Sequence, residues 1–223
     1  SVAADGFDTD DNSFLPQITP DGRYVAFESY ATNVVSGDGN GVGDAFVYDR
    51  TDDVMTRVTT SFGGTVEPDD RSLAISISDD GQRIAYHSWA ANLIGGDTNE
   101  LVDVYLFTMG DSTPVRLSGG STNADRPSVW PVVSGDGSTV VFESLAANLV
   151  GTDTDLYWDV YTHDVGTTLL DSVTPTDEEI DDNTWWIGDY PDTGFTDVVP
   201  GAFYEQGVPV SYTHLTLPTR DDV

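Results

Sequence analysis

The segment Thr19-Pro-Asp-Gly-Arg-Tyr-Val-Ala-Phe-Glu-Ser29 decides the fold of this 223-residue chain, because it recurs twice. The second copy is Ser78-Asp-Asp-Gly-Gln-Arg-Ile-Ala-Tyr-His-Ser88, and the third is Ser134-Gly-Asp-Gly-Ser-Thr-Val-Val-Phe-Glu-Ser144. The turn aspartates are 59 and then 56 residues apart: Asp21, Asp80 and Asp136. Repetition at this period is typical of architectures built from stacked supersecondary units.

Each copy predicts four short β-strands. In the first copy we expect them near residues 14–18, 23–29, 44–49 and 55–60, where apolar and β-branched residues cluster between turn signals. The Asp-Gly pair between the first two strands favours a tight hairpin, because glycine accepts positive φ. A four-stranded antiparallel sheet cannot cover both of its faces alone, so neighbouring copies must stack. The sequence therefore predicts an all-β fold: a β-propeller with about three four-stranded antiparallel blades of an incomplete ring.

The predicted domain organisation follows these copies. We expect three blades within residues 1–177, at about 13–64, 72–122 and 126–177, and a degenerate or partial fourth blade at 178–208. Residues 209–223 are predicted to be a non-native tail, because Val210–Thr219 resembles a translated sequencing adapter. The chain begins at Ser1 without a charged and then apolar leader, so we expect a signal peptide to have been removed or the N-terminus to be missing.

The repeated segment resembles TolB-like propeller repeats of the PD40 (WD40-like) type. The resemblance rests on the core Thr19–Ser29, on an Ala-x-Asn-Leu/Val step that follows it, and on an Asp-Val-Tyr-type third strand, as at Asp103–Tyr105. It covers roughly residues 13 to 177. It implies a ring of roughly six to eight blades that serves as a binding or scaffold surface. It also implies an exported protein, located extracellularly, at the cell surface or in the periplasm.

The charge of this chain restricts its partners. The formal net charge is −31; all eight basic residues are Arg, and most of the 39 acidic residues are Asp. Such a field repels phosphate backbones and anionic lipids, so neither nucleic acid nor a membrane surface is an expected partner. No stretch has the roughly 20 apolar residues needed for membrane insertion. A protein or a cationic ligand is the expected partner. The acidity indicates either a surface adapted to high salt, as in halophilic proteins, or calcium-binding loops.

One loop pattern recurs in all three copies and supplies candidate metal ligands. Carboxylate and amide oxygens spaced two and then four residues apart suit Ca²⁺, which takes six to eight oxygen ligands. The alternative is that these side chains form Asx-turns with their own backbone. The loops lack the glycine and distal Glu of an EF-hand, and without Cys no thiolate site exists. The candidate calcium ligands are Asp38, Asn40, Asp44, Asp97, Asn99, Asp103, Asp153, Asp155 and Asp159.

The loop after the second strand and the loop between blades are predicted to lie on the same rim. This rim would be strongly acidic, either a solvated surface suited to high salt or a site for cations; its residues are Asp38, Asp97, Asp153, Glu67, Asp69, Asp70, Asp125, Asp177, Glu178 and Glu179. The second strands end at equivalent positions that we expect to face a shared surface: Glu28, His87 and Glu143. Carbohydrate binding by stacking, or packing between blades, is open for four tryptophans: Trp130, Trp158, Trp185 and Trp186.

These observations predict a noncatalytic, exported binding or scaffold module. Its acidic loop face is a candidate calcium-binding site. No Gly-x-Ser-x-Gly elbow is present, and three equivalent serines, Ser29, Ser88 and Ser144, indicate architecture rather than a nucleophile. The alternative hypothesis is an enzyme. In that case the segment would be the propeller domain of a larger hydrolase, such as a peptidase, or of a polysaccharide lyase.

Overall fold

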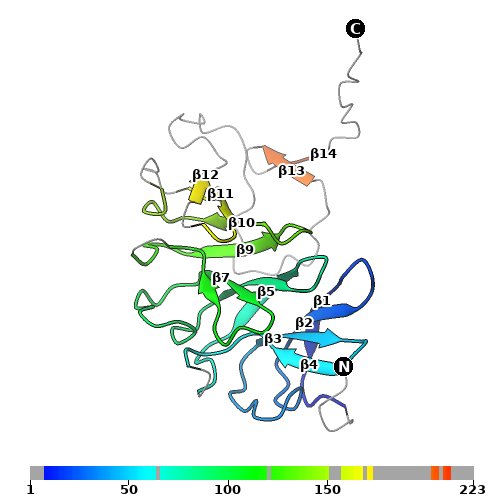
Figure 1. Cartoon of the computed structure of the whole chain (residues 1–223). Coiled ribbons are helices and arrows are strands. Elements are labelled where there is room, and N and C mark those ends of the chain that lie inside the picture. The colour runs from blue at the N-terminus through cyan, green and yellow to red at the C-terminus, as the bar shows by residue number, and fades with distance from the viewer. Residues whose placement is uncertain are drawn as a thin grey trace. The chain divides into compact units, whose positions relative to one another are not determined.

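The computed structural model of this chain describes residues 8–63, 66–119, 122–150 and 157–167 in full, and the backbone of 170–172, 202–205 and 208–211. The chain forms two compact units, residues 1–177 and 178–223. The first unit contains three four-stranded antiparallel sheets (Figure 1). The second contains a described hairpin of β13 (Ala202–Glu205) and β14 (Val208–Ser211).

The three sheets correspond to the three sequence copies. The first blade consists of β1 (Ser13–Ile18), β2 (Tyr24–Ser29), β3 (Asp44–Asp49) and β4 (Val54–Arg57). The second consists of β5 (Ser72–Ile77), β6 (Arg83–Ser88), β7 (Asp103–Thr108) and β8 (Val115–Arg116). The third consists of β9 (Ser128–Val133), β10 (Thr139–Ser144), β11 (Asp159–Asp164) and β12 (Leu170–Ser172). The predicted all-β propeller blades are confirmed, and these three blades do not close a ring.

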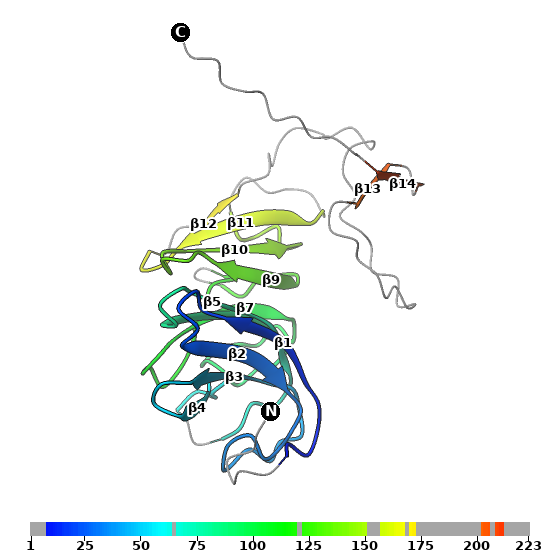
Figure 2. The same ribbon diagram turned by 90° about the vertical axis from the view of Figure 1, so that its right-hand side faces the viewer.

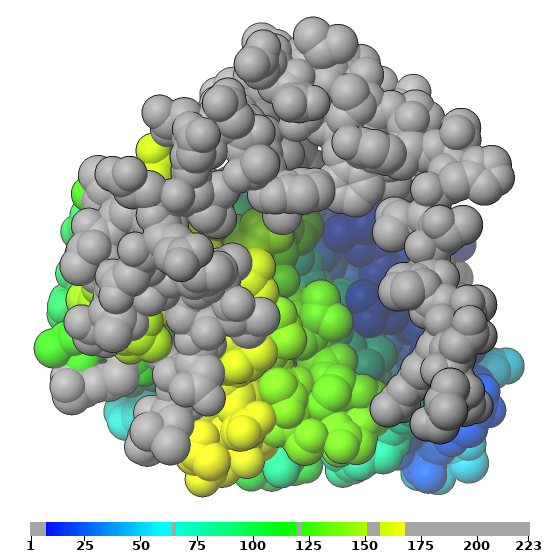
Figure 3. All heavy atoms as spheres, turned by 90° about the horizontal axis from the view of Figure 1, so that it is seen from above, coloured from blue at the N-terminus to red at the C-terminus, as the bar shows by residue number. Residues whose placement is uncertain are grey.

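Within each blade, neighbouring strands in the chain are neighbours in the sheet. The second and third strands pair over six residues in every blade, from Tyr24 opposite Asp49 to Ser29 opposite Asp44 in the first. Figure 2 shows the three sheets stacked one on another. In the space-filling view of Figure 3, the yellow atoms of residues 157–167 lie beside green atoms of earlier strands. The stacking explains why the sequence repeats: each blade provides the same surface for the next.

The Asp-Gly hairpins form as predicted, and those of the second and third blades also pack against the preceding blade. Gly22, Gly81 and Gly137 have φ values of 72°, 72° and 71°, in the left-handed region that favours glycine. A Cβ at Gly81 would collide with the ring of Tyr24 in the first blade. Glycine is therefore required at this turn by both its backbone angle and the close approach of the neighbouring blade.

The hydrophobic core lies between the blades. One cluster joins the first and second blades through residues such as Val47, Ile84 and Tyr86, and another joins the second and third through Leu106, Phe142 and others. Each blade also contains a stacked aromatic pair from its second and third strands, with ring centroids 5.7 to 5.9 Å apart: Phe27–Phe46, Tyr86–Tyr105 and Phe142–Tyr161. Burial of these large side chains provides the main stabilisation of the stack.

The ends of β2 and β6 fasten one blade to the next, which corrects the prediction that Glu28 and His87 face a shared surface; Glu143, at the equivalent position of β10, is half-buried. Glu28 and His87 are only 3% and 2% exposed. The Glu28 carboxylate accepts a hydrogen bond from the backbone N–H of Ile75, and His87 Nδ1 accepts one from the N–H of Trp130, at 3.4 and 3.2 Å. Ile75 and Trp130 lie at a β-bulge in the first strand of the following blade, β5 and β9 respectively. These side chains therefore satisfy backbone groups that the bulge leaves unpaired.

Candidate functional site: the acidic loop rim

A repeated asparagine fixes the two loops of the rim to each other. Asn92 accepts a hydrogen bond from the N–H of Asp69 and donates one to the carbonyl of Glu67. Asn148 makes the same pair with Asp125 and Asn123. Asn33 repeats this pattern with Asp10 and Asp8 in the first blade. The loop after the second strand and the loop before the first strand therefore lie on one rim, as predicted.

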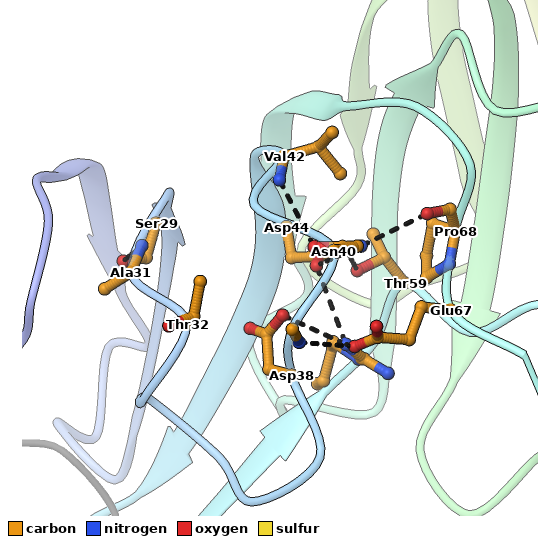
Figure 4. A network of polar contacts seen from close by, with 12 residues as sticks. Ser29, Ala31, Thr32, Asp38, Asn40, Val42, Asp44, Thr59, Glu67 and Pro68 are labelled. Atoms are coloured by element: carbon orange, nitrogen blue, oxygen red, sulfur yellow. Dashed lines mark hydrogen bonds and ion pairs between the residues drawn. The ribbon is translucent and has the colours of Figure 1, made fainter.

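In the first blade, two buried carboxylates and one partly exposed carboxylate converge on one arginine. We call this group the first loop cluster: Asp38, Asp44, Arg57 and Glu67. Arg57 Nη1 lies 3.4 Å from Asp38 Oδ1, 3.7 Å from Asp44 Oδ2 and 3.1 Å from Glu67 Oε1. The hydroxyl of Thr59 donates to Asp44, and Asn40 donates to the same carboxylate at 3.1 Å (Figure 4). Glu67 also accepts the N–H of Gly39. Three carboxylates thus face a single guanidinium.

The second blade repeats this arrangement with one carboxylate fewer, in a second loop cluster: Asp97, Asp103, Tyr105 and Arg116. Arg116 Nη1 lies 3.5 Å from Asp97 Oδ1 and 3.6 Å from Asp103 Oδ2. The hydroxyl of Ser118 donates to Asp103, and that of Tyr105 donates to Asp97, both at 2.6 Å. The residue in register with Glu67 is Asn123, whose amide donates to Thr98 rather than to the cluster.

Burial controls the protonation of these clusters. Burial away from solvent raises the pKa of Asp38 to about 6. The negative charge of Asp44 raises this pKa further, and the positive charge of Arg57 lowers it. Burial likewise raises the pKa of Asp103 to about 6, against the hydrogen bond from Ser118 and the charge of Arg116. Burial and the bond to Asp97 raise the pKa of the Tyr105 hydroxyl. Burial also raises the pKa of Asp44 in the first cluster. Each cluster therefore has at least one carboxyl that takes up a proton in mildly acidic solution.

The predicted Asx-turns are confirmed in both described copies of the loop. The side-chain carbonyl of Asn40 accepts the N–H of Val42, and that of Asn99 accepts the N–H of Leu101, each at 3.2 Å. Asp38 and Asp97 were expected on the solvated rim, but the structure turns them inward, and their side chains are 3% and 2% exposed. They are drawn inward by the arginines beneath the rim.

Sequence reasoning missed these two arginines, although a signal for them was available. Arg57 follows Asp44 by 13 residues, and Arg116 follows Asp103 by the same 13. Extending the alignment of the copies through the fourth strand would have placed both in register. An arginine on β4 or β8 then points to the carboxylates of the adjacent loop.

Calcium remains a prediction for these loops. Within residues 8–63, 66–119, 122–150 and 157–167, no three His, Cys, Asp or Glu side chains gather in a group that could hold a metal ion. Asp159 is 7% exposed and holds the position of Asp44 and Asp103. Asp153 and Asp155, together with the rim residues Asp177, Glu178 and Glu179, lie outside the described residues.

The exposed part of the rim is strongly acidic. In the described loops, seven exposed carboxylates accompany two exposed arginines, Arg71 and Arg126; the acidic residues are Asp8, Asp10, Asp11, Asp69, Asp70, Glu100 and Asp125. Their asparagine-fixed loops hold them in a defined arrangement. A surface of this kind attracts cations and repels anions.

Two of the four tryptophans considered for carbohydrate binding lie within the described residues. Trp130 is 48% exposed, and its ring meets His87 edge-on with centroids 5.4 Å apart. Trp158 is 45% exposed at the start of β11. Trp185 and Trp186 lie outside the described residues. Carbohydrate binding by this group therefore stays a prediction. Among the described residues there is no helix long and apolar enough to cross a membrane.

Comparisons with known proteins concern the fold. No protein-family model matches the chain, and no curated protein matches it. Among solved structures, a protein described as TolB from Agrobacterium tumefaciens is similar at 21% identity and a TM-score of 0.44, over 72% of this chain and 48% of that one. A prolyl endopeptidase is 14% identical (TM-score 0.45, 74% and 22% coverage), and an acylaminoacyl peptidase from Pyrococcus horikoshii is 13% identical (TM-score 0.40, 74% and 25%).

The chain therefore spans about half of the TolB structure and about a quarter of each peptidase.

Proposed function

We propose that this chain is a noncatalytic propeller module of an exported protein, whose acidic loop rim binds a basic segment of a partner protein. The observation that carries the proposal is the set of exposed rim carboxylates held in place by Asn33, Asn92 and Asn148. A preorganised surface loses little conformational entropy on binding. Its charge favours a partner rich in Lys or Arg and accelerates their encounter at low salt.

Charge alone does not distinguish the rim from the opposite end of the blades, so the test compares the two ends. The rim double variant Asp11→Asn/Asp125→Asn and the control Asp79→Asn/Asp111→Asn each remove two exposed charges. Binding of an arginine-rich nonapeptide is measured by calorimetry at low and at physiological salt. We expect the rim variant to weaken binding at least about fivefold and the control less than about twofold. Equal effects would show nonspecific attraction and remove the proposal.

A calcium site in the third loop is a second candidate function. In register with Asn99 the third copy has Asp155, and in register with Arg116 it has Ser172. Relative to the second loop cluster, this copy gains a carboxylate and loses the guanidinium that neutralises it. Asp153, Asp155 and Asp159 would offer the carboxylate oxygen ligands that Ca²⁺ prefers. We propose calcium at this loop rather than at the two loops whose carboxylates already face an arginine.

A thermal melt with millimolar Ca²⁺ tests the calcium proposal, with Mg²⁺ at matched ionic strength as the control. We expect Ca²⁺ to raise the Tm by several degrees, because a ligand that binds only the folded state stabilises it. The variant Ser172→Arg, which supplies the arginine of the other two blades, should abolish that rise. An equal rise with Mg²⁺, or one that survives in Ser172→Arg, would reject the site.

A further inference from the structure

One small cavity on the rim differs from the rest of the acidic surface because it combines carboxylates with an aromatic ring. It has a volume of about 280 Å³ and is lined by Asp69, Asp70, Trp89, Ala91 and Glu100. These residues come from the loop before β5, the end of β6 and the loop before β7. The cavity therefore lies on the second blade, where the two rim loops fixed by Asn92 meet.

The indole of Trp89 already binds a guanidinium. The Arg71 guanidinium carbon lies 4.3 Å from the centroid of the Trp89 ring, a cation–π contact. The His87 ring also meets the Trp89 ring edge-on, with ring centroids 5.1 Å apart. Burial lowers the pKa of His87 to about 4, so this imidazole is neutral and adds no positive charge to the cavity. The ring is thus held firmly in an environment suited to a cation.

The carboxylates of the cavity are available to a ligand. In the described part of the chain, none of Asp69, Asp70 and Glu100 forms an ion pair within 4 Å. Asp69 accepts the N–H of Ala91, and Asp70 accepts the N–H of Arg71, so both are oriented by the backbone. Three carboxylates accompany one nearby guanidinium, which leaves the cavity with a negative surplus.

The sister blades lack this combination of residues. In register with Trp89 the first blade has Tyr30 and the third has Leu145. In register with Glu100 stand Gly41 and Leu156, and in register with Asp70 stand Asp11 and Arg126. The repeat framework does not require these residues, because the other blades fold without them. Their coincidence on one blade indicates a local role.

We infer that this cavity is the anchor site for an arginine side chain of the basic partner, whose guanidinium takes the place of Arg71 on the Trp89 indole and pairs with Asp70 and Glu100. This inference rests on the proposed function and specifies where on the rim recognition occurs. A planar guanidinium can stack on an indole while pairing with carboxylates in two directions, which an ammonium group cannot do. Arginine should therefore bind better than lysine.

The test uses small probes with the full chain. Gly-Arg-Gly, Gly-Lys-Gly and the neutral Gly-norleucine-Gly, all as blocked peptides, are titrated while the indole N–H resonances are followed by NMR, with Trp89→Phe identifying the Trp89 signal. We expect Gly-Arg-Gly to shift the Trp89 resonance in a saturable way, Gly-Lys-Gly to bind several-fold more weakly, and Gly-norleucine-Gly to leave it unchanged. An equal shift with norleucine, or equal binding of lysine and arginine, would overturn the site.

A charge-matched pair of variants then locates the binding. Glu100→Gln should weaken Gly-Arg-Gly binding about fivefold, whereas Asp111→Asn, an exposed carboxylate at the other end of the blade, should change it less than about twofold. Glu100 is exposed, so its replacement leaves the fold intact, which unchanged thermal melting verifies. If the arginine-rich nonapeptide still prefers the rim while Glu100→Gln has no effect, the anchor site is rejected and the proposed function survives.

Discussion

The two loop clusters have the same framework but different charge balance. In the first, Asp38, Asp44 and Glu67 face Arg57. In the second, Asp97 and Asp103 face Arg116. No third carboxylate is present there, and the hydroxyl of Tyr105 donates a hydrogen bond to Asp97 instead. Phe46 stands in the first blade where Tyr105 stands in the second.

The difference shows that the repeat specifies where charges are buried but not how they are neutralised. A buried carboxylate must be paired, hydrogen-bonded or protonated, because an isolated ion in a low-dielectric interior is very unfavourable. The first cluster relies on a partly exposed third carboxylate and solvent. The second relies on a buried hydroxyl. We therefore expect equivalent substitutions in the two clusters to have unequal effects.

Removal of the arginine should have the largest effect and should separate the clusters. Arg57→Met leaves three carboxylates without their guanidinium, and Arg116→Met leaves two. Breaking a buried ion pair costs about 3–5 kcal/mol, so we expect both variants to lose stability on that order, with Arg57→Met the more severe. Urea unfolding at pH 7 measures this, with the exposed Arg126→Met as control. A loss below about 1 kcal/mol in both would show that the arginines are incidental.

Tyr105→Phe should affect only the second cluster. It removes the donor to Asp97 Oδ2, and Asp97 Oδ1 already has no hydrogen-bond partner. Leaving a buried acceptor unsatisfied costs about 1–3 kcal/mol, so we expect a loss in this range. The matched change Tyr48→Phe removes a hydroxyl that donates to the exposed Asp53, and should cost much less because solvent replaces the lost bond. Equal losses would mean that burial of Asp97 is unimportant.

The sequence predicted the fold well because the fold depends on patterns that repeat. Asp21-Gly22 and its copies predicted the hairpins, since only glycine readily adopts their positive φ. The recurrence of a four-stranded sheet predicted neighbouring blades, because such a sheet cannot cover both of its faces alone, and Tyr24–Ser29 is accordingly buried along nearly its whole length. The fourth strand was less predictable: 55–60 was expected and Val54–Arg57 is observed, because an outer strand has fewer buried residues to mark it.

The site was less predictable because its partners are distant in sequence. The Asp-x-Asn-x-x-x-Asp pattern identified Asp44 and Asp103 but not the direction of their side chains. That direction depends on Arg57 and Arg116 in the fourth strands, and on Glu67 in the next loop. Likewise, Glu28 and His87 looked like surface residues until the bulge of the neighbouring blade supplied their donors. Contacts between blades depend on three-dimensional register, which a single sequence shows only indirectly.

The pH dependence of stability should reveal protonation of at least one carboxyl in each cluster. The pKa values of Asp38 and Asp103 are raised from 3.8 to about 6. Between pH 4 and 6 the folded state keeps protons that the unfolded state has lost, so stability is present below pH 4 and is lost as pH rises to 6. We expect a loss on the order of 1–2 kcal/mol per cluster across this window. The variants Asp38→Asn and Asp103→Asn should each remove part of that slope.

The turn aspartates provide the opposite sign and thus an internal control. Hydrogen bonds from Ser134 and Ser138 lower the pKa of Asp136 to about 2, so its contribution is present above pH 4 and is lost as pH falls. Thermal melts from pH 2 to 8 should therefore show maximal stability near pH 4. If the slope between pH 4 and 6 is the same in Asp103→Asn as in the parent chain, the general repulsion among surface carboxylates causes it instead.

Glu67→Gln should have the smallest effect and tests the first cluster alone. The side chain is 31% exposed, and its ion pair with Arg57 is therefore partly screened by solvent. Glutamine can still accept the N–H of Gly39, so we expect a change within about 1 kcal/mol. Removing this negative charge relieves repulsion on Asp38, whose pKa should fall and whose part of the pH 4–6 slope should shrink. In the second cluster, Asn123 occupies the position of Glu67. Asn123→Glu should therefore produce the converse change and steepen the slope between pH 4 and 6. If neither substitution changes this slope, the third carboxylate does not distinguish the clusters.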